Sequence, residues 1–244
     1  MKQKILYTCV SHIGNCRKSN QDNYICGGMY MDKEICPDKT FLQGCAEEEP
    51  ALYGVFDGLG GEARGEVAAR IAAEAAAKLK IGKNSIRQIE NMCYDANDLI
   101  CQYSEENEVG SMGTTAALIA IEEEKAVICN IGDSKIFRYS ANELDQLSVD
   151  HVLDGINGRK PLLTQNLGIP EDEMIIEPYI AEFTYKKGDI FLMCSDGLTD
   201  MVSKPEMKEI FRQYEYPSLA EKLLDTALGN GGKDNVTIVL CKIA

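Results

Sequence analysis

The chain has 244 residues, with 25 Lys and Arg against 39 Asp and Glu, and its formal net charge is −14. This acidic balance excludes a nucleic-acid-binding face and the basic face of a membrane-surface helix, because both need clustered positive charge. No run approaches the roughly 20 apolar residues of a membrane span, and the first apolar segment is too short for a secretory signal. We therefore expect a cytoplasmic protein whose surplus of acidic side chains mainly serves solubility.

The soft metal ligands are few and scattered. Ten cysteines occur without any C-x-x-C pair, and the only histidines are His12 and His151. A zinc site usually shows closely paired ligands, and a disulfide framework is typical of small secreted chains. Cys129 and Cys194 stand within apolar runs and are predicted to be small buried hydrophobic residues. Any metal chemistry therefore falls to carboxylate oxygens, which favour Mg or Mn over Zn.

The first part of the chain mixes short strands with two helices. Alternating or apolar β-type runs cover residues 3–10, 23–31 and 51–57. Apolar residues then recur at helical spacing in two segments, one opened by Gly60 and Gly61 and ending near Lys80, the other spanning about 84–105.

From Thr114 onward the pattern is mainly that of strands. The turns between successive strands are too short for crossover helices, which favours antiparallel pairing. The predicted strands are 114–121, 125–131, 135–140, 143–148, 175–185, 189–195 and 236–242. The predicted helices are 204–213 and 217–228, and residues 150–170 look like a loop. Without an internal repeat or a linker, we expect one α+β layered domain over 1–244.

Four aspartates stand at strand ends. Asp57, Asp133 and Asp196 each follow an apolar run, and Asp234 comes just before the last predicted strand. Any one of them could simply make a turn, because Asp caps nearby N–H groups and the adjacent glycines tolerate positive φ. Four together are better explained by a hard divalent cation, which offsets the repulsion between gathered carboxylates.

The order of the motifs around these residues is similar to that of a known family. The motifs are Arg17-Lys18-Ser19-Asn20-Gln21-Asp22, Val55-Phe56-Asp57-Gly58-Leu59-Gly60-Gly61, Gly113-Thr114-Thr115-Ala116, Asn130-Ile131-Gly132-Asp133-Ser134, Cys194-Ser195-Asp196-Gly197-Leu198 and Asp234-Asn235. They resemble the metal-dependent protein phosphatases (PPM), the type 2C serine/threonine class, from about residue 4 to 242. The compact length resembles the bacterial members, which are little more than a catalytic domain.

The resemblance implies a fold and a metal centre. The fold would be a central β-sandwich of two antiparallel sheets flanked by pairs of antiparallel helices, in four layers. Asp57 would bridge two Mn or Mg ions at one end of the sandwich, with the Gly58 carbonyl completing one site and Asp196 and Asp234 the other. Asp133, together with Asp196, would hold a third and weaker ion.

The resemblance also implies a reaction. Phosphoserine and phosphothreonine monoesters would be hydrolysed by attack of a metal-bridging hydroxide, with Arg17 binding the phosphate and Asp22 orienting the water. A guanidinium suits this task because it donates two parallel hydrogen bonds to a phosphate. The partners would be phosphorylated proteins, targets of a serine/threonine kinase, and we expect a monomer.

Some residues depart from the family pattern. Leu59 stands where many eukaryotic members have a histidine proposed as general acid, so the sequence shows no obvious residue for general acid catalysis. Lys135 and Gln165 each replace the usual Arg, and the flap segment near 150–170 is short. His151, after Asp150, by contrast resembles a family Asp-His pair, and it fits a structural role as well as a catalytic one. These departures concern substrate selection and flap docking more than metal binding.

Three other interpretations remain to be weighed. Residues 58–63 fit the dinucleotide fingerprint G-x-G-x-x-A, but no second parallel strand with a ribose-binding acid follows. Residues 229–234 resemble a P-loop, yet a strand follows where a helix is required. The remaining alternative is a catalytically weak, phosphatase-like module that binds phosphoproteins. The full set of aspartates and Arg17 argues against it, because a binding module needs no complete metal site.

Overall fold

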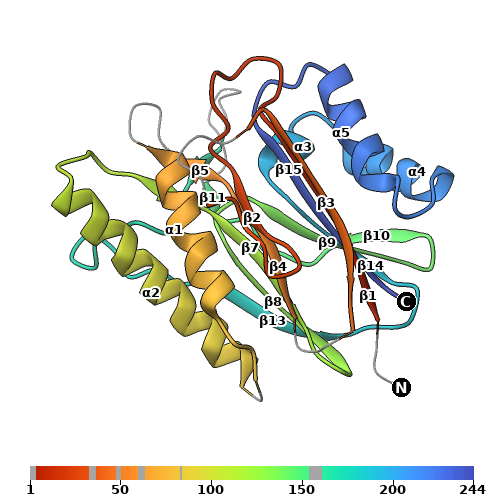
Figure 1. Ribbon diagram of the computed structural model, residues 1–244, viewed down its shortest axis with the longest axis horizontal. Coiled ribbons are helices and arrows are strands. Elements are labelled where there is room, and N and C mark those ends of the chain that lie inside the picture. The colour runs from red at the N-terminus through yellow and green to blue at the C-terminus, as the bar shows by residue number, and fades with distance from the viewer. Residues whose placement is uncertain (1–3, 33–36, 48–50, 60–63, 83, 154–160) are drawn as a thin grey trace.

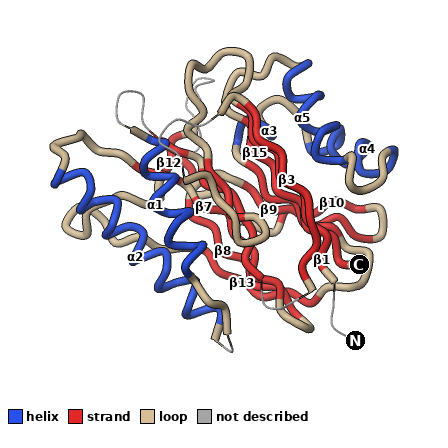
Figure 2. The backbone as a smooth tube through the Cα atoms, viewed as in Figure 1, coloured by secondary structure: helices blue, strands red, loops and turns tan. Residues whose placement is uncertain are grey.

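Two antiparallel β-sheets pack face to face, and helices cover both outer faces of this sandwich (Figure 1, Figure 2). The computed structural model describes residues 4–32, 37–47, 51–59, 64–82, 84–153 and 161–244. The α+β sandwich predicted from the sequence is therefore confirmed. The glycines at 60 and 61, expected to open the first helix, and part of the predicted flap lie outside the described residues.

The first sheet has six strands in the order β10-β9-β14-β15-β1-β3. Its long central pairs, β1 with β15 and β14 with β15, are antiparallel and in continuous register. Its strands are β1 (Ile5–His12), β3 (Lys39–Ala46), β9 (Lys135–Ser140), β10 (Glu143–Gln146), β14 (Ile190–Cys194) and β15 (Val236–Ile243).

The second sheet has five strands in the order β13-β8-β7-β4-β2. Its strands are β2 (Asn23–Ile25), β4 (Ala51–Phe56), β7 (Ala116–Ile121), β8 (Lys125–Ile131) and β13 (Tyr179–Thr184). Two small two-stranded sheets complete the described strands. They pair β5 (Gly58–Leu59) with β6 (Gly113–Thr114), and β11 (Val152–Leu153) with β12 (Leu162–Leu163).

The helices lie on opposite sides of the sandwich. Helices α1 (Gly65–Lys78) and α2 (Ser85–Glu106) pack on the five-stranded sheet. Helices α3 (Asp196–Thr199), α4 (Lys204–Gln213) and α5 (Leu219–Gly229) pack on the six-stranded sheet. Repeated alanines on the buried face of α1 allow the helix to approach the sheet closely. Among the described helices, none is both long and apolar enough to cross a lipid bilayer.

Three apolar clusters hold the layers together. One lies between the two sheets, and one lies under each group of helices. The inter-sheet cluster includes Tyr53, Phe191 and Val239, and it confirms that β-strands from both halves of the chain share one interior. Cys129 and Cys194 are fully buried in these clusters, as the apolar runs around them predicted.

The structure corrects three expectations about helices and strands that were drawn from the sequence. Strand β3 was not expected, because it is an edge strand with no fully buried residue. The predicted strand 23–31 is wrong beyond Ile25, since the chain turns back at Gly27 and Gly28, both with positive φ. The short helix α3 begins at Asp196 directly after β14, too short a segment to produce a helical repeat.

Candidate active site

The antiparallel order of the strands brings six sequence-predicted residues to one end of the sandwich. In the five-stranded sheet, β4 and β8 run in the same direction and end before Asp57 and Asp133, while β2 starts after Asp22 at that same end. In the six-stranded sheet, β14 ends before Asp196 and β15 begins after Asp234. The end of β1 leads to the loop that carries the sixth residue, Arg17. We call this end of the molecule the carboxylate end.

The charges at the carboxylate end act on one another. Burial raises the pKa of Asp57 well above its usual range, and the neighbouring charges of Asp22, Asp196, Asp133 and Asp234 raise it further. Repulsion between gathered carboxylates has this effect because each favours the neutral form of the others. The five side chains predicted from separate motifs therefore form one electrostatic group.

The backbone of Asp57 is held by two threonines that the motifs contained but to which no role was assigned. Thr115 Oγ1 accepts the N–H of Asp57 at 3.1 Å, and the N–H of Thr115 donates to the Asp57 carbonyl at 2.9 Å. Thr114 Oγ1 donates to the same carbonyl at 2.9 Å. Thr115 Oγ1 also pairs with Ser134 Oγ at 2.7 Å, which links the Asp57 loop to the turn of Asp133.

Asp22 is 1% exposed and belongs to a buried hydrogen-bond chain. Ser195 Oγ donates to Asp22 Oδ2 at 2.8 Å and accepts the N–H of Thr237 at 2.9 Å. Burial raises the pKa of Asp22 to about 7, against the hydrogen bonds from Thr237 and Ser195, which lower it. Ser195 directly precedes Asp196, so its hydroxyl links Asp22 to the segment that carries Asp196.

Arg17 stands at the mouth of the site with about half of its side chain exposed. Its Nη2 donates to Asp234 Oδ2 at 2.6 Å. Asn235 fixes the loop that carries Arg17, since its Nδ2 donates to the carbonyls of Ile13 and Ser19 at 2.9 and 3.0 Å. Asn235 is thus a second site residue whose role the sequence did not reveal, because its contacts lie more than 200 positions away.

Two glycines next to the carboxylates are required for backbone approach. A Cβ on Gly58 would lie 2.4 Å from the carbonyl oxygens of Gln21 and Gly65. A Cβ on Gly197 would lie 1.9 Å from the carbonyl oxygen of Asn235. Neither position can hold another residue without moving the backbone. The glycines in the two Asp-Gly pairs therefore bring separate loops into contact, and the turn-forming explanation alone is insufficient.

The residues that depart from the family pattern have structural partners. Lys135 Nζ pairs with Asp150 Oδ2. His151 Nδ1 accepts the N–H of Gly132 at 3.1 Å, and burial lowers the pKa of this histidine. Gln165 Oε1 accepts the N–H of Glu177 at 3.0 Å. His151 therefore supports the turn that carries Asp133, which favours its structural interpretation.

A cavity of about 400 Å³ opens beside the carboxylates. It is lined by Arg17, Gly197, Asp200, Met201, Lys233 and Asp234. Two cations, Arg17 and the exposed Lys233, therefore face a space bordered by Asp234. Asp200 and Asp234 balance their charge, so Arg17 and Lys233 are the groups of this lining that can contact an anion.

The residues at the carboxylate end fit a hard divalent cation. The donors available are carboxylate oxygens, with a backbone carbonyl at Gly58, and Mg and Mn prefer oxygen ligands. A cation would also remove the repulsion that raises the pKa of Asp57. Within the described parts of the chain, no group of three or more Cys, His, Asp or Glu side chains is arranged closely enough to hold a metal ion as it stands. The fit therefore rests on the chemistry of the donors and their mutual repulsion.

Comparison with known proteins connects this arrangement to an enzyme family. A family model described as protein phosphatase 2C matches residues 30–230. The serine/threonine phosphatase stp of Listeria welshimeri is 31% identical over 93% of this chain and 91% of its own length. The serine/threonine protein phosphatase PstP of Mycobacterium tuberculosis is 29% identical over 79% of this chain and 40% of its own length.

The solved structures extend the similarity to three dimensions. The catalytic domain of the serine/threonine protein phosphatase PstP, solved in complex with two manganese ions, superposes with a TM-score of 0.80. It is 27% identical, and the match covers 99% of each chain. PppA of Pseudomonas aeruginosa, at 22% identity, has the same fold with a TM-score of 0.81. The sandwich that carries the carboxylate end is thus shared over its whole length.

Proposed function

This chain belongs to the protein phosphatase 2C family, and on that premise we propose that its carboxylate end hydrolyses phosphoserine and phosphothreonine monoesters of proteins. The chain is accordingly a metal-dependent phosphoprotein phosphatase. The observation that carries the proposal is the electrostatic group of five aspartates, drawn from five separate segments, next to an exposed arginine. A divalent ion can activate water for attack on a phosphate ester, and an arginine can bind the phosphate oxygens.

We assign the metal ligands residue by residue. Asp57 would contact both ions of a binuclear centre, with the carbonyl of Gly58, Asp196 and Asp234 as further ligands and Asp133 serving a weaker third ion. The two manganese ions of PstP support Mn, and Mg suits the same oxygen donors. When bound, such ions lower the pKa of water to give a nucleophile and neutralise the charge of the phosphoryl oxygens.

Arg17 is proposed to bind the substrate phosphate. Its side chain lies at the mouth of the site, and its Nη2 reaches Asp234 at 2.6 Å, so a phosphate held by the remaining guanidinium N–H groups would lie beside the metal ligands. Lys233 faces the same cavity and adds a second positive charge. Asp22 is proposed to orient the attacking water, because Ser195 holds its carboxylate in one position inside the protein.

The substrates would be phosphorylated proteins, targets of a serine/threonine kinase, and the protein would act as a single-domain monomer in the cytoplasm.

The site has no evident general acid among the residues considered. Leu59 has no acidic proton, and His151 is hydrogen-bonded to the backbone of Gly132. The leaving group would therefore be protonated by water or by another group of the site.

Hydrolysis of a phosphothreonine peptide tests the proposed function. Wild-type protein should be active with Mn, inactive after treatment with EDTA, and active again when Mn is restored, while Asp196→Ala should be inactive throughout. Turnover that survives EDTA would contradict the metal mechanism. Binding of the peptide without turnover under any divalent metal would favour the phosphoprotein-binding module instead.

The role of Arg17 has a separate test. Arg17→Ala should raise KM for p-nitrophenyl phosphate by about tenfold or more, because a charge-assisted hydrogen bond to the phosphate is lost. Lys18→Ala is the matched control, since Lys18 is the neighbouring exposed cation. An unchanged KM for Arg17→Ala would reject the assignment.

A further inference from the structure

The turn that carries Asp133 lies between β8 and β9 and is held from more than one direction. Gly132 has a φ of +100°, and a Cβ there would lie 2.5 Å from the side chain of Thr115, so only glycine fits. Ser134 Oγ pairs with Thr115 Oγ1 at 2.7 Å. These contacts join the turn to the loop of Asp57. A different part of the chain, the segment around Asp150, holds the turn as well.

The segment around Asp150 lies beside the end of β8, to which four hydrogen bonds tie it. The fully buried Asn130 donates from Nδ2 to the carbonyl of Val149 at 2.7 Å, and its Oδ1 accepts the N–H of Val149 at 3.2 Å. The N–H of His151 donates to the carbonyl of Gly132 at 2.9 Å, and the N–H of Gly132 donates to His151 Nδ1 at 3.1 Å. Asp150 therefore stands between two residues that are fixed to β8 and its turn.

Lys135 connects Asp150 to Asp133. Its Nζ forms an ion pair with Asp150 Oδ2 and donates to the carbonyl oxygen of Asp133 at 3.3 Å. Gln146 Nε2 donates to the other oxygen of the Asp150 carboxylate at 2.8 Å. The Asp150 carboxylate is thus engaged on both sides, and it anchors an ammonium group that holds the backbone of Asp133. Fixing this backbone restricts the directions in which the Asp133 side chain can project.

The ion pair of Lys135 and Asp150 is partly shielded from solvent. Their side chains are 19% and 25% exposed, whereas those of Lys125 and Glu182 are 36% and 46% exposed. A shielded ion pair keeps more of its strength, because exposed pairs are weakened by water and salt. Lys125 opens the same strand, β8, roughly 26 Å of strand away from Asp133. The pair of Lys125 and Glu182 therefore offers a matched comparison at the far end of β8.

We propose that Lys135 is a positioning residue that holds Asp133 in the orientation needed to bind a divalent cation. This inference rests on the proposed function, in which Asp133 serves the third and weaker ion. Groups that fix the orientation of a metal ligand contribute to metal affinity, and their loss weakens it by about 10- to 100-fold. The charge of Lys135 alone would have the opposite effect, because an ammonium group repels a nearby cation. Positioning and simple electrostatics thus predict changes of opposite sign.

A titration of metal-free protein with manganese chloride, with free Mn measured by electron paramagnetic resonance, tests the inference. Wild type should show tight binding and one weaker event, and Asp133→Asn should abolish only the weaker event. Lys135→Met should weaken that event by about tenfold, whereas loss of the ammonium charge alone would strengthen it. Lys135→Arg should restore the wild-type affinity, since a guanidinium can also pair with Asp150 and donate to the carbonyl. Unchanged tight binding verifies that each variant is folded.

A double variant removes the effect of charge altogether. Lys135→Met/Asp150→Asn keeps the wild-type net charge but lacks the ion pair, and it should also weaken the third binding event by about tenfold. The control Lys125→Met/Glu182→Gln makes the same change of charges at the far end of β8 and should bind Mn as wild type does.

Two results would overturn the positioning role alone. They are a third event that is as strong as in wild type, or stronger, in Lys135→Met, and wild-type affinity in the double variant. If wild type shows no weaker event, or if Asp133→Asn retains it, Asp133 is not a ligand and the inference fails with that assignment. Hydrolysis of the phosphothreonine peptide tests the remainder of the proposed function separately.

Discussion

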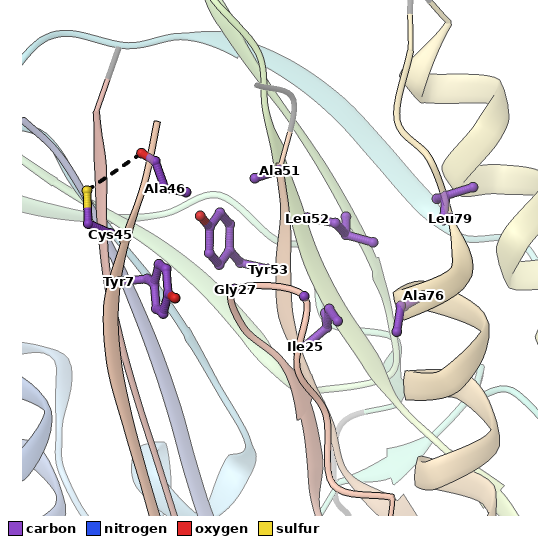
Figure 3. Close-up of a pocket in the computed structure, with 12 residues that line it drawn as sticks. Tyr7, Ile25, Gly27, Cys45, Ala46, Ala51, Leu52, Tyr53, Ala76 and Leu79 are labelled. Atoms are coloured by element: carbon purple, nitrogen blue, oxygen red, sulfur yellow. Dashed lines mark hydrogen bonds between the residues drawn. The ribbon is translucent and has the colours of Figure 1, made fainter. Parts of the chain in front are cut away.

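The two ends of β4 differ in how their polar groups are satisfied. At the carboxylate end, Asp57, Asp22 and Arg17 have backbone or side-chain partners, and the unfavourable contributions are the burial of charge and, after it, the repulsion among the carboxylates. At the other end, the surroundings are mostly apolar (Figure 3), and the unfavourable contribution is the buried hydroxyl of Tyr53, which has no partner among the described residues. The two ends therefore differ in their unfavourable contributions: gathered negative charge, which a cation would offset, at one end, and a hydroxyl without a partner among the described residues at the other.

The glycines at the two ends of β4 also differ in what surrounds them. Gly197 is required because another backbone lies where its side chain would be, whereas Gly28 faces open space and is required only for its φ of +75°. The glycine contacts at the carboxylate end are thus with other backbone segments, whereas at the other end those of Gly27 and Gly44 are with the Tyr7 side chain and Gly28 has none. Three experiments with substituted proteins can break or sharpen this contrast.

The largest effect is expected for Asp57→Asn. Hydrolysis should fall by about 1,000-fold or more, since the charge that holds the proposed ions is lost and such ions contribute several kcal/mol to transition-state stabilisation. The thermal stability measured in EDTA should rise, because a buried charge and its repulsion with four other carboxylates are removed. Asp225→Asn, on the exposed surface of α5, is the control and should change neither property much. A loss of stability in Asp57→Asn would mean that buried, mutually repelling charge is not the dominant unfavourable contribution at this end.

The next effect concerns the two glycines. Gly197→Ala should lower the free energy of unfolding by about 3 kcal/mol, because its Cβ would lie 1.9 Å from the carbonyl oxygen of Asn235. Gly28→Ala should cost only about 1 kcal/mol, the strain of a left-handed conformation without a clash. Urea unfolding of both variants gives the comparison. Equal losses would show that the carboxylate end can relax more than its geometry indicates.

The smallest effect distinguishes Tyr53 from Tyr216, whose hydroxyl is hydrogen-bonded to Thr8. Tyr216→Phe should lower the free energy of unfolding by about 1 kcal/mol, since the hydroxyl of Thr8 loses its partner. Tyr53→Phe should leave it unchanged or raise it slightly, because the lost hydroxyl had no partner in the folded protein. The same urea experiment measures both. A clear loss in Tyr53→Phe would show that its hydroxyl is hydrogen-bonded in solution.

Most of the helices and strands could be predicted from periodicity, whereas the two-sheet sandwich was expected from the family resemblance. Helix α2 and strands β8 and β9 match their predicted ranges within one or two residues, because each has a strong apolar pattern of its own. Strand β3 could not be predicted in this way. Its residues alternate between half-buried and exposed, and its pairing with β1 arises from contacts to residues about 30 positions earlier in the chain.

In the candidate site too, some residues could be predicted from the sequence and others could not. The aspartates could be found because they stand next to apolar runs, where a strand must end. The partners that hold them could not, since Thr115, Ser195 and Asn235 are ordinary polar residues until the fold brings their contacts within reach. Whether Asp57, Asp133, Asp196 and Asp234 act as metal ligands stays a prediction for the experiments above.

The sequence by itself determined the strand ends, the acidic residues that occupy them and their similarity to a phosphatase family, because these depend on local patterns and motif order. Only the tertiary structure decided that Ser195 joins Asp22 to the segment of Asp196, that Gly197 touches Asn235, and that the Tyr53 hydroxyl has no partner among the described residues. Such features depend on where distant segments meet. The charge of −14 predicted solubility, but the packing of two sheets decided that five of its carboxylates repel one another at a single end.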